Sequence, residues 1–281
     1  MSLEEIFFNW IDKPRATYET AELFPQLRRN PDSYSELLQA NLKYQIKDKV
    51  LDCLSSNDEL SKEWKDQNAK FLRYHKSLTS HTFFNSIPID HYIGAKTKLA
   101  YVKRLRVADI GGGTGHFLSS FFRFPHEIEY FLVDPNVREL HDQFVRMYPE
   151  LLEIPIAHLR AKAEELPFKD GSMDLIISSS AIDHYDDFKK FLIESERVLK
   201  PGGQVLISSH LKKSVRSKSR SGSILETAIR LIHRMRNRVA MDDHTLEFES
   251  TKPIIVELEK LGLKLEMDEI FKNYFYLVAR K

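Results

Sequence analysis

Four of the chain's ten glycines stand close together in the stretch VADIGGGTGHF, directly after an apolar run that ends near Asp109. They are Gly111, Gly112, Gly113 and Gly115. A strand that turns through such glycines into a helix presents bare backbone N–H groups and a helix N-terminus, and both bind anionic or polar groups. The dinucleotide-binding pattern G-x-G-x-x-G does not fit, because His116 stands where its last glycine would be. The stretch predicts a ligand-binding turn of another kind, and the alternative is a glycine-rich turn without a ligand.

An acid follows the next apolar run, where Asp134 stands before Pro135. Ligands of parallel sheets bind beyond the carboxyl ends of the strands, and a carboxylate there can accept hydrogen bonds from both hydroxyls of a ribose. We therefore expect Asp134 to contact a nucleoside. The alternative is that it is an ordinary turn residue before proline.

Groups able to move a proton follow a later apolar run. Ser178 stands at the end of that run, and Asp183 and His184 lie in the loop that comes after it. Histidine titrates near neutral pH, so it can take a proton from a hydroxyl or an amine at physiological pH. His244, in the stretch HTLEFES, is a second candidate. The alternative interpretation is that these residues only cap or anchor helices.

The spacing of apolar residues indicates which elements position these groups. After residue 105, short runs rich in β-branched residues alternate with helical segments, which is typical of a largely parallel sheet covered by helices on both faces. The strand-like runs are LRVADI, EYFLVD, MDLIISSS, GQVLISS, LKLEMDEIF and YFYLVAR. The helix-like segments are HFLSSFFRF, VRELHDQFVRMY, FKKFLIESERVLK and TKPIIVELEKLG. Before residue 105, apolar spacings of three, four and seven predict helices over about 33–78 and 90–105.

Three stretches resemble the class I S-adenosylmethionine-dependent methyltransferases of the small-molecule type. The pattern D-x-G-x-G-x-G from Asp109 to Gly115 resembles the family's first motif. AKAEELPFKDGSMD resembles its segment between the third and fourth strands, and ERVLKPGGQVLIS resembles its turn into the fifth strand. The resemblance implies a Rossmann-like α/β fold with seven mostly parallel strands and an N-terminal helical cap. It also implies S-adenosylmethionine as the cofactor.

The resemblance gives roles to residues of this chain. It implies that Asp134 contacts the ribose and that Ala163 and Glu164 border the adenine. The full set of cofactor-binding residues that we expect is Asp109, Gly111, Gly112, Gly113, Asp134, Pro135, Ala163, Glu164 and Ser178. The catalytic candidates are His184, Asp183 and His244, and no metal is implied.

The predicted organisation is an N-terminal helical cap region over residues 1–104 and a methyltransferase domain over residues 105–281. The predicted activity is transfer of a methyl group from S-adenosylmethionine to an oxygen of a small-molecule, sugar or lipid-linked acceptor, with nitrogen or carbon as the second choice. One alternative is an RNA or protein methyltransferase, which would need a broad basic groove. The other is a non-catalytic S-adenosylmethionine-binding assembly protein.

Composition and charge exclude several classes of protein. The chain has 281 residues, 42% of them hydrophobic, and a formal net charge of +1, so it can bury a full core and has no overall attraction for nucleic acid. Its single cysteine, Cys53, excludes a disulfide framework or a cysteine-based metal cluster within the chain. No apolar run reaches the roughly 18 residues of a membrane span, and the start MSLEEIFFNW is acidic. We expect a cytoplasmic protein.

A lid-like basic insertion is predicted at about residues 211–245, between the fifth and sixth strands of the family fold. Residues 211–240 contain nine Lys or Arg against one acid, and their second half has the apolar spacing of an amphipathic helix. We expect a lid that attracts an anionic acceptor. Peripheral contact with an anionic membrane is the second interpretation and nucleic acid ranks third. The alternative is a helix that packs on the protein through its apolar face, leaves its arginines in solvent and has no role in binding.

Overall fold

The computed structural model describes residues 37–39, 45–47, 50–54, 89–93, 99, 103–113, 115–121, 127–137, 156–212, 246–271 and 273–281. Most of the predicted cap and of the basic insertion lies outside these residues, as does the predicted helix VRELHDQFVRMY. None of the helices that fall within the described ranges combines the length and the apolar character needed to cross a membrane.

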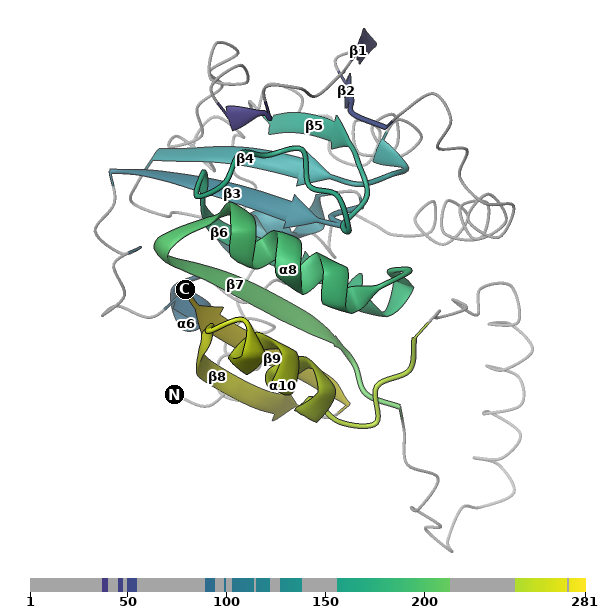
Figure 1. Cartoon of the computed structure of the whole chain (residues 1–281), viewed down its shortest axis with the longest axis vertical. Helices are drawn as coiled ribbons and strands as arrows, with labels where there is room; N and C mark the ends of the chain where they lie inside the picture. The colour runs from purple at the N-terminus through teal and green to yellow at the C-terminus, as the bar shows by residue number, and fades with distance from the viewer. Residues whose placement is uncertain are drawn as a thin grey trace, which may run out of the picture.

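A single sheet organises the described residues, in the strand order β1-β2-β5-β4-β3-β6-β7-β9-β8 (Figure 1). Its strands are β1 (Gln45–Lys47), β2 (Val50–Asp52), β3 (Arg104–Ile110), β4 (Glu127–Val133), β5 (Ile156–Arg160), β6 (Met173–Ser179), β7 (Leu199–His210), β8 (Lys264–Phe271) and β9 (Tyr274–Arg280). Strands β5, β4, β3, β6 and β7 run parallel, and β9 and β8 join as an antiparallel hairpin. The chain builds outward from β3 through β4 to β5 and then returns to the other side of β3 with β6. The strand order therefore reverses between β3 and β6.

Helices cover both faces of this sheet. Helices α8 (Phe188–Val198) and α10 (Lys252–Lys260) lie on one face, where Phe191, Leu192 and Ile254 belong to one buried cluster (Figure 1). The 3-10 helices are η2 (His116–Phe121) and η4 (Ile182–His184), and the short α6 spans Ile89–Ile93. Residues of η2 and α6 belong to a second buried cluster, which includes Leu175 and Val278 of the sheet. The two clusters show that alternate side chains of the central strands pack on opposite faces.

Most of the strands and helices predicted after residue 105 that fall within the described residues are confirmed. Each of the six strand-like runs forms a strand, and β3 to β9 make the seven-stranded, mostly parallel sheet that was expected. FKKFLIESERVLK and TKPIIVELEKLG contain α8 and α10, whereas HFLSSFFRF contains the 3-10 helix η2. The division into residues 1–104 and 105–281 stays a prediction.

The helical assignment of residues 45–52 is wrong. Residues 45–47 and 50–52 form the hairpin β1–β2, and β2 pairs in parallel with β5. Ile46, Val50 and Leu54 are spaced by four, which predicts a helix, but β5 presents an unpaired strand edge to them. Hydrogen bonding to that edge, with Val50 and Leu51 buried, outweighs the local helical pattern.

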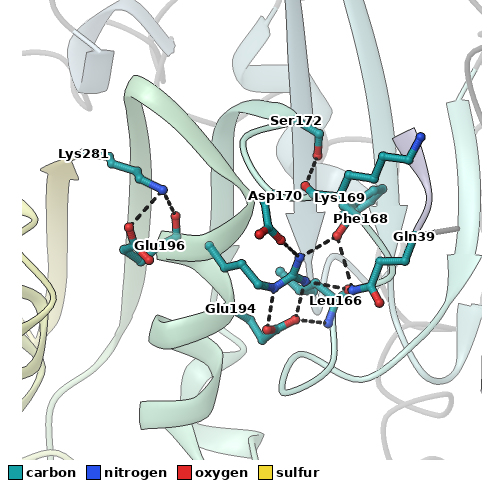
Figure 2. Close-up of polar contacts among 10 residues, drawn as sticks. Gln39, Leu166, Phe168, Lys169, Asp170, Ser172, Glu194, Glu196 and Lys281 are labelled. Atoms are coloured by element: carbon teal, nitrogen blue, oxygen red, sulfur yellow. Dashed lines mark hydrogen bonds and ion pairs between the residues drawn. The ribbon is translucent and has the colours of Figure 1, made fainter. Parts of the chain in front are cut away.

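A cluster of hydrogen bonds fixes the loop between β5 and β6 to helix α8. The Arg197 guanidinium donates to the Glu194 carboxylate at 2.7 and 2.8 Å, to Asp170 at 2.7 Å, and to the carbonyls of Leu166 and Phe168 at 3.0 and 2.8 Å. Glu194 also accepts from the Leu166 amide at 2.8 Å. Figure 2 shows these carboxylates and carbonyls converging. Arg197 shares the Leu166 and Phe168 carbonyls with the Gln39 amide, which donates to them at 3.1 and 3.4 Å, and it adds charge-assisted bonds to Glu194 and Asp170.

Arg197→Ala should destabilise the fold. We expect the free energy of unfolding to fall by about 1.5–3 kcal/mol, the range for a hydrogen bond that involves a charged group, because the bonds from the guanidinium to Glu194 and to the loop carbonyls are lost. Urea unfolding measures the change. Lys189→Ala is the control, since its ammonium lies 3.6 Å from Glu257 in an exposed pair and its removal should leave the midpoint nearly unchanged. Equal midpoints for the two variants would contradict a structural role for Arg197.

Candidate ligand site at the carboxyl edge of the sheet

The predicted site residues gather where the strand order reverses. The Gly111 amide, just after β3, donates to the Val133 carbonyl of β4 at 2.7 Å. The Asp134 amide, just after β4, donates to the Leu159 carbonyl of β5 at 3.1 Å. These bonds continue the parallel ladder one residue past the strands, so three neighbouring loops begin at the same edge of the sheet. Ligands of such sheets bind at this edge.

Two of the glycines are required by the protein's own packing. A Cβ atom at Gly111 would lie 2.5 Å from the Ala181 Cβ and 3.0 Å from the Tyr185 hydroxyl. A Cβ atom at Gly112 would lie 2.3 Å from the Leu132 Cδ1. The distances of 2.5 and 2.3 Å are repulsive for a Cβ atom. The backbone of the loop after β3 therefore packs directly against its neighbours.

Gly113 and Gly115 are required by conformation. Their φ angles are +56° and +74°, in the left-handed region that glycine enters without steric cost. The Gly115 amide donates to the Gly112 carbonyl at 2.7 Å, which tightens the turn. Gly111 has φ +66° as well, so backbone shape requires glycine at three positions of the turn, and packing restricts Gly111 and Gly112.

The Asp134 carboxylate is held over this turn. It is 7% exposed, and its Oδ2 accepts from the Gly113 amide at 3.1 Å while its Oδ1 accepts from the Asn136 amide at 2.7 Å. Each carboxylate oxygen can accept more than one hydrogen bond. The neighbouring Pro135 carbonyl accepts from the Arg160 Nε at 3.1 Å, which fixes the loop from β5.

Asp109 lies beneath the turn rather than on its surface. It is 1% exposed, and its Oδ2 accepts a 2.6 Å hydrogen bond from the Tyr130 hydroxyl. Burial raises the pKa of Asp109 to about 7, the Tyr130 hydrogen bond lowers it, and the Asp134 charge raises it. The sequence did not predict the contact of Tyr130 with Asp109, because Tyr130 has the pattern of an ordinary apolar residue within β4.

Ser178 is connected to the glycine turn through Tyr185. The Tyr185 hydroxyl donates to the Ile110 carbonyl at 2.9 Å, and the Ser178 hydroxyl lies 2.8 Å from it. The two side chains are buried, so this bond network links the end of β3 to the end of β6. Sequence reasoning also missed Tyr185, because only the folded loop brings it back across β6.

Ala163 and Glu164 follow β5 at the next loop along the edge. Ala163 is buried, and the Glu164 Oε1 accepts from the Asp187 amide at 3.2 Å. Asp187 is the N-cap of α8, where its carboxylate accepts from the amides of Lys189 and Lys190. Burial raises the pKa of Glu164, and its hydrogen bond with the Asp187 amide lowers it. Glu164 therefore joins its loop to the start of α8.

Asp183 and His184 follow β6 after a strained turn. Ser180 has φ +54°, which is unusual for a residue with a side chain, and its amide donates to the Ser208 carbonyl of β7 at 2.7 Å. The turn leads into η4, where Asp183 is buried and His184 is partly exposed. The Asp183 carbonyl accepts from the Leu246 amide at 2.8 Å. His244 lies outside the described residues, two positions before Leu246.

Residues 108–207 match the profile of a protein family described as a methyltransferase domain. An uncharacterized methyltransferase of Mycobacterium sp. (strain KMS) is 35% identical over 102 residues, which are 36% of this chain and 37% of that protein. The ubiquinone/menaquinone biosynthesis C-methyltransferase UbiE of Vibrio vulnificus (strain YJ016) is 36% identical over 103 residues, which are 36% of this chain and 40% of that protein. The matched part therefore spans about two fifths of these curated relatives.

Solved structures show the same fold over a larger part of the chain. A putative S-adenosyl-L-methionine-dependent methyltransferase from Methanococcus maripaludis superposes with a TM-score of 0.51 at 18% identity, over 81% of this chain and 97% of that chain. An O-methyltransferase family 2 protein from Planctomyces limnophilus DSM 3776, solved in complex with apigenin, gives a TM-score of 0.51 at 15% identity, over 80% of this chain and 63% of that chain. The described sheet therefore has the class I methyltransferase fold.

Burial of Asp109 should make stability depend on pH. An acid whose pKa is raised in the folded protein binds more protons when folded, so the free energy of unfolding falls as pH rises from the ordinary value of 3.8 to about 7. Urea unfolding at about pH 5 and about pH 8 should show a smaller loss for Asp109→Asn than for the parent.

Tyr130→Phe provides the matched control for this titration. Loss of its hydrogen bond removes an effect that lowers the pKa of Asp109, so the stability loss should extend to higher pH. The same pH dependence in the parent and in Asp109→Asn would show that Asp109 does not titrate in this range.

Proposed function

We propose that this chain, whose residues 108–207 are a methyltransferase domain of the class I S-adenosylmethionine-dependent fold, transfers a methyl group from S-adenosylmethionine to an oxygen of a small-molecule, sugar or lipid-linked acceptor. The observation that carries the proposal is the buried Asp134 carboxylate, held by the Gly113 amide above the glycine turn at the point where the strand order reverses. The Gly113 and Asn136 amides fix this carboxylate at the edge of the sheet where ligands of such folds bind.

The residues present fit this cofactor. Asp134 offers acceptors to two ribose hydroxyls, as a nucleoside requires. The loop that contains Ala163 and Glu164 lies on the β5 side of Asp134, at the place where the resemblance puts the adenine. The half-exposed backbone of Gly111 and Gly112 allows the remainder of the molecule to approach β3 closely. When bound, S-adenosylmethionine supplies an electrophilic methyl group on a sulfonium sulfur.

The protein's own task is then to orient the acceptor, exclude water and remove a proton. We assign proton removal to His184, with Asp183 beside it in η4 and His244 as the second candidate. Support comes from the position of η4 directly after β6, next to the glycine turn, with His184 partly exposed. The strained turn at Ser180 holds this loop against β7.

Carbon is the second candidate for the methylated atom. It is favoured by one observation, the 36% identity over 103 residues with a C-methyltransferase of Vibrio vulnificus. The choice between oxygen and carbon depends on the acceptor rather than on the shared cofactor domain. The basic residues of 211–240 support an anionic acceptor or membrane headgroups as partners, and the small acceptor is preferred to RNA or protein because the basic charge is confined to that segment.

Asp134→Ala should weaken binding of S-adenosylmethionine by about 1.5–3 kcal/mol, because hydrogen bonds to a carboxylate are lost. Calorimetric titration measures the affinity. Asp134→Asn is the matched variant: it keeps the size and one acceptor oxygen, so its affinity should lie between those of the alanine variant and the parent. A folded alanine variant that binds S-adenosylmethionine as tightly as the parent would remove Asp134 from the ribose site.

A screen of small hydroxylated compounds with S-adenosylmethionine labelled with ¹³C at its methyl group identifies the acceptor. The ¹³C chemical shift of the product separates an O-methyl from a C-methyl group. With that acceptor, His184→Ala should turn over roughly a hundredfold to ten-thousandfold more slowly than the parent and keep its cofactor affinity. His184→Gln should be equally slow because an amide is not a base. Near-normal turnover in both variants would exclude His184 as the base.

A further inference from the structure

A row of aromatic rings crosses the sheet at the ends of β7 and β9, on the face covered by α6. The Tyr92 and Tyr276 ring centroids are 5.9 Å apart, those of Tyr276 and Tyr274 are 5.3 Å apart, and those of Tyr274 and His210 are 4.4 Å apart. Tyr92 belongs to α6, which lies beside β9 in Figure 1. Tyr92 also lies 5.9 Å from the Phe117 ring of η2, the helix that follows the glycine turn. The row therefore reaches the cofactor side of the molecule.

The row is not wholly buried in the core. Tyr92 is buried, but Tyr274 and Tyr276 are half-buried and His210 is exposed. All of them except Tyr92 come from the last residues of β7 or the first residues of the antiparallel β9, so they lie at the edge of the sheet where the parallel strands end. This is the edge at which Gly111 and Asp134 stand.

Hydroxyl groups lie beside these rings. The Ser208 hydroxyl of β7 donates to the Ser179 hydroxyl of β6 at 2.9 Å. Tyr274 shares hydrogen bonds with the hydroxyls of Ser179 and Ser208, which lower its pKa, although burial raises that pKa more strongly. Ser179 is half-buried, and it immediately precedes the strained turn that leads to Asp183 and His184. Polar donors and acceptors thus meet an aromatic surface next to the proposed base.

The charges around the row are acidic. The Asp183 charge contributes to the raised pKa of Tyr274, and the Glu269 charge contributes to the raised pKa of Tyr92, in both cases after burial. The Glu269 carboxylate also lies 3.6 Å from the His91 Nε2. Two carboxylates beside the rings disfavour an anionic group at this place.

We infer that Tyr274, Tyr276 and His210, with the hydroxyl of Ser179, bind the methyl acceptor, and that the bound part of the acceptor is an uncharged aromatic ring carrying a hydroxyl group. Aromatic side chains bind planar rings by offset or edge-to-face contacts, and a few placed polar groups fix the orientation in such sites. The ring hydroxyl bonds to Ser179 and Tyr274 and points toward the loop that holds His184. The inference rests on the proposed function and adds the chemical class of the acceptor to it.

Calorimetry on the full chain loaded with S-adenosylhomocysteine tests the inference. The probe is 2-naphthol, and 2-methoxynaphthalene has the same rings without the donating hydroxyl. The parent should bind 2-naphthol about threefold to tenfold more tightly than 2-methoxynaphthalene, as one hydrogen bond implies. Ser179→Ala should remove this preference. Tyr276→Leu should weaken binding of both probes by about threefold to tenfold, and Tyr276→Phe, which keeps the ring, should restore it.

The outcomes separate this inference from the proposed function. Failure of the parent to bind S-adenosylhomocysteine would overturn the proposed function itself. Normal binding of S-adenosylhomocysteine with no binding of 2-naphthol, or with equal binding in the parent and Tyr276→Leu, would overturn only the aromatic acceptor. Tighter binding of 6-hydroxy-2-naphthoate or of methyl glucoside than of 2-naphthol would also overturn it, in favour of an anionic or a sugar acceptor. Circular dichroism confirms that each variant is folded.

Discussion

The contact between the turn after β3 and its two neighbours is the constraint on which the site depends. Gly111 packs against Ala181 and Tyr185 from the β6 side, and Gly112 packs against Leu132 of β4. A Cβ atom at Gly111 would lie 2.5 Å from the Ala181 Cβ, so glycine allows these two loops to approach closely. The Gly111 and Gly112 amides donate to the Val133 carbonyl and the Gly115 amide donates to the Gly112 carbonyl, so these N–H groups hold the turn in place. Asp134 can then bond to the Gly113 amide and present its carboxylate beside the turn.

The same turn brings buried acids together. Asp109 lies beneath it and Asp134 above it, and burial together with the Asp134 charge raises the pKa of Asp109. Tyr130 opposes this rise with a short hydrogen bond to Asp109. Glu164 belongs to the next loop and bonds to the first turn of α8, while Arg197 near the end of α8 bonds to the carbonyls that follow Glu164. Helix α8 therefore positions the loop that contains Ala163 and Glu164 from both of its ends.

The edge is built differently at β6, β7 and β9. Strands β6 and β7 end at the same edge as β3 and the antiparallel β9 begins there, and the residues of these three strands at the edge are serines, tyrosines and a histidine rather than glycines. The hydrogen bond from the Ser180 amide to the Ser208 carbonyl joins the ends of the parallel strands β6 and β7. The left-handed turn at Ser180 then directs the chain into η4. The paired rings of His210 and Tyr274, whose centroids are 4.4 Å apart, lie at this same edge of the sheet, where we propose that the acceptor binds.

The sequence by itself determined the parts of this protein that depend on local pattern. The run before Asp109, the glycines after it and the acid at Asp134 predicted a strand, a turn and a second strand end. The α/β alternation predicted six strands of a largely parallel sheet, and the resemblance to the methyltransferases implied the seventh, which is β5. These signals are readable because a buried parallel strand is continuously apolar and a left-handed turn requires glycine.

Only the tertiary structure decided the rest. It paired residues 50–52 with β5 against their helical spacing, since an unpaired strand edge is a partner that no local pattern contains. It placed Asp109 below the turn on Tyr130, brought Tyr185 back across β6 to the Ile110 carbonyl, and aligned Tyr92 with residues more than 180 positions away in the sequence. Each of these contacts joins segments that are distant in the chain, and their energies exist only when the strands are assembled in one order.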